Sequence, residues 1–153
     1  MTFAPPPFAR LPLRFDVDAL RAAVAALPAD AWLPHFNTGY YEGDWSGVAL
    51  RSHEDAFTPL APGLGEARPT MYCDAFWQTQ LARLGTDLHS ARLLRLGPGG
   101  CIREHRDHDL GQPDGDLRIH VPIITDAQVD FLLDGRRIPM QAGECWFLDL
   151  SRP

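Results

Sequence analysis

The sequence lacks the features that mark several broad classes of protein. No apolar run is long enough to cross a bilayer, and the start, MTFAPPPFARLPLRF, lacks the basic residues and apolar segment of a signal peptide. There is no basic stripe either, and the net charge is −6. We therefore expect neither a membrane nor a nucleic-acid partner. The chain also contains no internal repeat.

Cysteine is scarce as well. The three residues, Cys73, Cys101 and Cys145, are odd in number and do not have the spacing of metal ligands. A disulfide framework is therefore not predicted. We expect small buried thiols in a protein of the reducing cytoplasm.

What is present fits one folded domain. A chain of 153 residues with 45% hydrophobic residues can bury a core. The three consecutive prolines near the start predict an extended surface arm over residues 1–15. The spacing of apolar residues in FDVDALRAAVAAL predicts a helix with Asp16 as its cap. A second helix is predicted over about residues 73–84, after a long loop at 53–70.

After Ser90 the pattern changes to short β-type runs. ARLLRL, CIREHRDH, LRIHVPII, VDFLLDG, RRIPM and CWFLDL are separated by Gly, Pro and Asp turns, which is typical of an antiparallel sandwich or barrel. LLDGRRI places Asp-Gly between apolar runs and predicts a hairpin. The predicted fold class is mainly β (α+β), with N-terminal helices before a small jelly-roll-like β unit.

The segment CIREHRDHDLG, residues 101–111, is the strongest candidate for a site. Side chains two apart on a strand point the same way, so His105 and Asp107 would project together. An imidazole and a carboxylate are two of the three ligands in the facial triad that binds Fe(II). By itself His-x-Asp is a weak signal, and a charged, solvated strand end is the better interpretation of the motif alone.

A second pair of polar residues follows in LRIHVPI. Arg118 and His120 share one face of a predicted strand, while Leu117, Ile119 and Val121 share the other. A buried cation needs a counter-charge, and a guanidinium fits a carboxylate with two parallel hydrogen bonds. A bound dicarboxylate would explain this pair. An outward-facing pair on a half-exposed strand is the alternative.

LLRLGPGGCIREHRDHDLG, RIHVPI and AGECWFLDLSRP together resemble the aspartyl/asparaginyl β-hydroxylase family, over roughly residues 91–153. The resemblance implies a double-stranded β-helix (jelly-roll, cupin-like) oxygenase that uses Fe(II) and 2-oxoglutarate. It also implies a single oxygenase-like domain over residues 1–153. Residues 1–90 would form its helical and aromatic part, and residues 91–153 its β-roll core.

The resemblance also implies roles for individual residues. His105 corresponds to the first iron ligand and Asp107 to the carboxylate ligand. Arg118 and His120 match an Arg-x-His pair near the cosubstrate and the acidic group of the substrate. In the family a second iron histidine directly follows a segment like LDLSRP, and an arginine that binds 2-oxoglutarate comes some ten residues later. Because this sequence ends at Pro153, we expect a C-terminally shortened domain. If the domain ended there, it would bind iron poorly and have little or no activity.

Two functions fit the sequence. The first is a 2-oxoglutarate-dependent dioxygenase that hydroxylates an amino-acid or peptidyl side chain, acting on a small molecule or peptide. The second is a non-catalytic cupin-like module that binds a metal or a small acidic ligand. Tyr40, Trp45 and Arg51 are candidates for the substrate pocket, although packing is the better interpretation of the two aromatic residues. The sequence predicts neither the substrate nor the oligomeric state.

Overall fold

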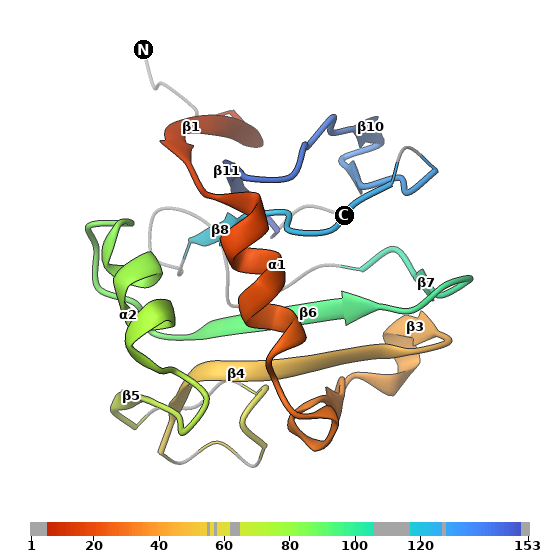
Figure 1. Ribbon diagram of the computed structural model, residues 1–153. Helices are drawn as coiled ribbons and strands as arrows, with labels where there is room; N and C mark the ends of the chain where they lie inside the picture. The colour runs from red at the N-terminus through yellow and green to blue at the C-terminus, as the bar shows by residue number, and fades with distance from the viewer. Residues whose placement is uncertain are drawn as a thin grey trace. The chain divides into compact units, whose positions relative to one another are not determined.

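The computed structural model describes residues 6–54, 56, 58–61, 65–105, 117–126 and 128–150 (Figure 1). The chain forms two compact units. We call Met1–Ala25 with Glu104–Pro153 the terminal unit, and Ala26–Arg103 the middle unit. The terminal unit is thus built from both ends of the sequence.

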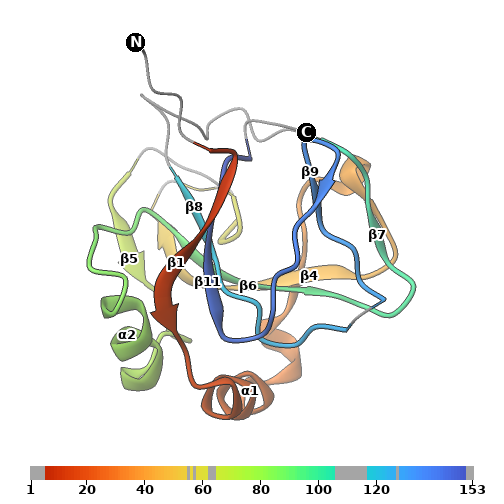
Figure 2. The same ribbon diagram turned by 90° about the horizontal axis from the view of Figure 1, so that it is seen from above.

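An antiparallel three-stranded sheet with the strand order β1–β11–β8 organises the terminal unit (Figure 2). Its first strand was predicted to be a surface arm, and that prediction is wrong. Pairing with β11 satisfies backbone groups that an arm would leave to water. The elements of this unit are β1 (Phe8–Arg14), α1 (Val17–Ala25), β8 (Arg118–His120), β9 (Leu132–Leu133), β10 (Arg136–Arg137) and β11 (Glu144–Leu148).

The buried cluster of the terminal unit lies on one face of this sheet. Trp146 and Leu148 are two apart on β11 and therefore point to the same side. Both are buried, and Leu148 is only 1% exposed. The cluster comprises Leu133, Ile138, Trp146 and Leu148, with Phe8, Phe131, Met140 and Leu150 packed against it.

The predicted hairpin is confirmed. Strands β9 and β10 pair antiparallel, with Leu133 opposite Arg136. The two residues between them, Asp134 and Gly135, have φ angles of 54° and 74°. Positive φ at both positions is what a type I′ turn requires, and Asp-Gly adopts it readily.

The long strand β4 is the centre of the middle unit and pairs with β2, β5 and β6 (Figure 1). Six consecutive residues at its start are buried, as expected for a strand covered on both faces. The elements are η1 (Ala29–Ala31), β2 (Leu33–Pro34), η2 (Thr38–Tyr40), β3 (Tyr41–Glu42), β4 (Trp45–His53), β5 (Ala67–Pro69), α2 (Ala75–Ala82), β6 (Ala91–Leu96) and β7 (Cys101–Ile102).

Both α-helices form where the sequence predicts them. At α1 the Asp16 carboxylate accepts a hydrogen bond from the backbone N–H of Ala19, which confirms the predicted cap. Helix α2 is shorter than predicted and begins after Asp74, whose carboxylate accepts from the backbone N–H of Trp77. The cap residue thus sets the start of each helix.

The fold is mainly β with two α-helices, as predicted. Within the described residues the sheets have three, two, four and two strands, and none closes into a barrel. The three cysteines form no disulfide, but Cys101 is exposed, which contradicts the expectation of a buried thiol at that position. No helix in the described parts of the chain is long and apolar enough to cross a membrane.

Candidate functional site

Arg118 and His120 lie on the face of β8 that carries the buried cluster. His120 is opposite Trp146 on β11, and Arg118 is opposite Leu148. Residues directly opposite in an antiparallel pair project to the same side of the sheet. A guanidinium and an imidazole therefore lie on the same side as a tryptophan and a leucine of the core. Both polar side chains are half-buried, so the outward-facing alternative does not describe this pair.

The surroundings keep His120 neutral at physiological pH. The pKa of the imidazole is lowered from 6.5 to about 4, mainly by burial and further by the positive charge of Arg118. The ring of Phe131 lies 5.9 Å from the imidazole ring, centroid to centroid. Arg118 is therefore the charged member of the pair, while the neutral imidazole can both donate and accept a hydrogen bond.

This shift makes the stability of the protein depend on pH. The unfolded chain binds the proton below pH 6.5, whereas folded His120 binds it only near pH 4, so stability is lost as the pH falls through this window. From His120 alone we expect the free energy of unfolding to fall by about 2 kcal/mol between about pH 7.5 and about pH 5. Urea unfolding at the two pH values measures this loss.

The variant His120→Gln should lose less stability between the two pH values than the wild type. His89→Gln is the matched control, because it removes an exposed histidine of the middle unit. This control should retain the wild-type loss. An equal loss in wild type and His120→Gln would contradict the assignment to His120.

The predicted iron ligands are described only in part. The strand predicted to extend through both residues ends at Ile102, so His105 lies in irregular backbone and is half-buried. Alternation along a strand therefore does not apply at His105, and Asp107 lies outside the described residues. Among the residues that are described, no three His, Cys, Asp or Glu side chains lie close enough to hold a metal ion. The ligand pair stays a prediction.

The three residues predicted for a substrate pocket lie in the middle unit. Trp45 is 8% exposed and its ring stacks on that of His35, with centroids 3.7 Å apart. The Tyr41 ring contacts the same indole edge-on. Trp45 is therefore a packing residue of the middle unit. Tyr40 is half-buried at the end of η2. Arg51, on β4, lines a hollow in the surface.

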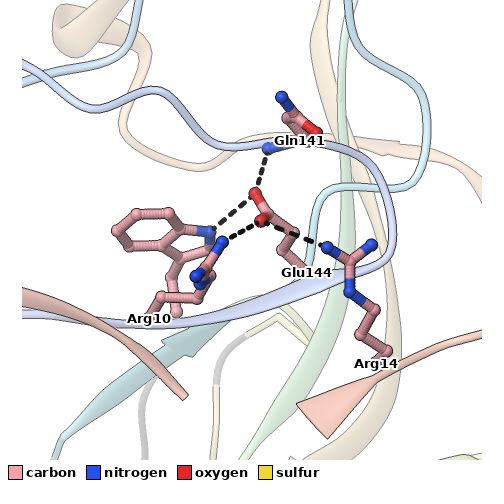
Figure 3. Close-up of polar contacts among 5 residues, drawn as sticks. Arg10, Arg14, Gln141 and Glu144 are labelled. Carbon is pink, nitrogen blue, oxygen red and sulfur yellow. Dashed lines mark hydrogen bonds and ion pairs between the residues drawn. The ribbon is translucent and has the colours of Figure 1, made fainter. Parts of the chain in front are cut away.

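The buried carboxylate of Glu144 was missed in the sequence (Figure 3). It lies on the same face of the β1–β11–β8 sheet as Arg118 and His120. Its Oε1 accepts from the backbone N–H of Gln141 at 2.7 Å and from Trp146 Nε1 at 3.4 Å. Its Oε2 accepts from Arg10 at 3.0 Å, and an Arg14 nitrogen lies 3.8 Å away. An acid two residues before an inward-facing tryptophan was the signal that could have found it.

These contacts set the ionisation of Glu144. The hydrogen bond from the Gln141 N–H has the largest effect and lowers the pKa of the carboxyl. Burial raises this pKa, while the contacts with Arg10 and Trp146 lower it further, so that the net shift is downward. Stability from this group is therefore present above pH 4.5 and is lost as the pH falls through the folded pKa. Through Arg10 the Glu144 carboxylate links β11 to β1. It also accepts a hydrogen bond from Trp146, which lies opposite His120.

A profile of the family described as aspartyl/asparaginyl β-hydroxylase matches residues 16–152. The chain belongs to this family. The resemblance seen in the sequence is thus confirmed and extends over both units. No solved structure matches the chain.

Membership gives the chain a hydroxylase-type domain, in a class that generally needs iron and 2-oxoglutarate. The matched range contains all four residues of the candidate site in the terminal unit. Three of them are described, and two of these, Arg118 and His120, share the face with the core cluster.

Proposed function

We propose that this protein is an Fe(II)- and 2-oxoglutarate-dependent dioxygenase that hydroxylates an amino-acid or peptidyl side chain. The proposal includes the double-stranded β-helix fold of such oxygenases. The observation that carries it is the pairing of Arg118 with a neutral His120 on the core face of β8. A half-buried cation beside an uncharged imidazole is suited to an anionic cosubstrate.

The residues present fit the cosubstrate by their chemistry. In this proposal Arg118 binds a carboxylate of 2-oxoglutarate, and His120 donates a hydrogen bond to the same ligand or to an acidic group of the substrate. A carboxylate beside Arg118 would also offset the positive charge that lowers the pKa of His120. Ligand binding should therefore raise the pKa of this imidazole.

The proposed metal ligands are His105 and Asp107. Imidazole and carboxylate are the donor types of the facial triad that binds Fe(II), and His105 is half-buried in the terminal unit. When bound, the iron would supply the oxygen chemistry that replaces an unactivated C–H bond by C–OH. The protein's own residues hold the metal and orient the bound acid. In this proposal the core cluster on the face of Arg118 and His120 would limit the access of water to the bound acid.

The proposal is tested on the full-length protein, loaded with Fe(II) without oxygen and then given 2-oxoglutarate and isotope-labelled dioxygen. The substrates are free amino acids and short peptides containing Asp or Asn. We expect succinate to form together with a product that has gained one labelled oxygen atom. A folded, iron-loaded protein that binds 2-oxoglutarate but turns over none of the panel would favour the non-catalytic module.

A further inference from the structure

A hollow of about 310 Å³ opens on the middle unit between β4, β5 and the segment from α2 to β6. Its apolar wall includes Leu81 and Leu88, and its polar groups include Arg51 and Gln78. This volume is at the lower end of the range for small-molecule sites. The hollow thus combines an arginine with apolar surface and has room for a small organic molecule.

The guanidinium of Arg51 is only partly satisfied. One terminal nitrogen donates to the Ala67 carbonyl at 2.9 Å. The Nε atom is buried and has no hydrogen-bond partner, and no acidic group among the described residues lies within ion-pair distance of Arg51. A buried donor without an acceptor is uncommon in folded proteins and is costly when it belongs to a charged group.

The neighbouring thiol does not supply the missing negative charge. Cys73 is 5% exposed and lines the same hollow. Burial raises the pKa of the thiol, and the opposing effect of Arg51 is smaller, so Cys73 stays protonated at physiological pH. The thiol therefore does not neutralise Arg51, which makes no ion pair with a described residue.

We propose that this hollow is a binding site for a small organic carboxylate, with Arg51 as the residue that binds the carboxylate. The guanidinium of Arg51 would donate to the carboxylate, and Leu81 and Leu88 would contact an apolar body of the ligand. The site lies within the middle unit and uses none of the proposed iron or 2-oxoglutarate residues. It therefore does not depend on the proposed dioxygenase function.

A monocarboxylate suits the hollow better than a phosphate. The guanidinium already uses one nitrogen on Ala67, which leaves a single edge for a planar carboxylate. Asp87 is exposed and also lines the hollow, so it repels a dianion more strongly than a monoanion. The apolar wall contributes nothing to binding a bare inorganic anion.

The test uses para-fluorobenzoate as the probe and para-fluorobenzamide, which has the same shape and no charge, as its control. Fluorine NMR of each compound is recorded with the full chain, without iron or 2-oxoglutarate. We expect saturable binding of the acid in the millimolar range and much weaker binding of the amide. Equal binding of both compounds, or none of the acid, would overturn the proposal.

Variants assign the binding to the hollow. Arg51→Gln should weaken the binding of the acid by about tenfold or more. Arg83→Gln is the matched control, because it removes one positive charge just after α2 from a residue that does not line the hollow. It should leave binding unchanged. Equal affinity in wild type and Arg51→Gln would contradict the proposal.

Two further substitutions keep the test decisive if Arg51→Gln does not fold. Ala82 is exposed on α2 and lines the hollow, so Ala82→Phe should fill the space and abolish binding without disturbing the core. Asp87→Asn removes the repelling carboxylate and should tighten binding by about twofold to threefold. Unchanged affinity in both variants would overturn the proposal.

Discussion

Arg118→Gln is expected to raise the KM for 2-oxoglutarate by roughly a hundredfold, with a smaller effect on kcat. The substitution removes a half-buried cation that in our proposal binds a carboxylate. Losing one partner of such a charged hydrogen bond costs about 2–5 kcal/mol. Steady-state kinetics on the iron-loaded protein gives KM and kcat, and quenching of tryptophan fluorescence without oxygen gives the affinity directly.

The matched controls separate binding from stability. Arg118→Lys keeps the charge without the planar fork and should recover part of the affinity. Arg136→Gln removes an exposed arginine of the same unit, which lies over the Phe8 ring at 5.6 Å, and should leave the KM near wild type. A wild-type KM for 2-oxoglutarate in Arg118→Gln would contradict the role assigned to this residue.

Glu144→Ala is expected to have the largest effect on stability, a loss of about 3 kcal/mol in the free energy of unfolding. The substitution leaves the buried Trp146 Nε1 and the Gln141 N–H without their acceptor. It also leaves a space where a side chain only 4% exposed was packed. Urea unfolding near neutral pH, followed by tryptophan fluorescence, measures the difference.

The ion pair itself should account for little of this loss. The Arg10 side chain is 62% exposed, so Arg10→Ala should cost less than about 1 kcal/mol. Glu42→Ala is the matched acidic control. It should also have little effect on the free energy of unfolding, because Glu42 is 71% exposed although its ion pair with Arg103 is only 2.6 Å long. The burial of the acidic side chain, and not the length of its ion pair, decides how much stability is lost. A loss as small in Glu144→Ala as in Glu42→Ala would contradict this account.

Local features could be predicted from the sequence because neighbouring residues determine them. The Asp16 cap needs only the backbone N–H of Ala19 three residues later. The Asp-Gly turn between β9 and β10 needs only two residues that tolerate positive φ. The shared face of Arg118 and His120 likewise follows from the alternation of side chains along β8.

Features that join distant segments could not be predicted. The prolines before β1 are typical of an arm, but residues 8–14 pair with a strand more than 130 positions later, where Arg10 lies opposite Trp146. The acid in ECWFLDL gave no sign of its partners, because Arg10 and Arg14 belong to that same distant strand. The end of β7 at Ile102 was also misjudged, because the prediction extended the strand through the charged residues that follow.

The sequence alone determined the family, the mainly β character and the polar pair on β8, because motifs, turn residues and alternation are properties of short segments. Only the tertiary structure decided which side of β8 faces the core, because that depends on β11 and its register. It also decided that Glu144 is a buried ionised group and that Arg51 lines a hollow while its buried Nε has no hydrogen-bond partner. Burial and ion pairing between distant residues depend on how the chain packs, and no short segment encodes them.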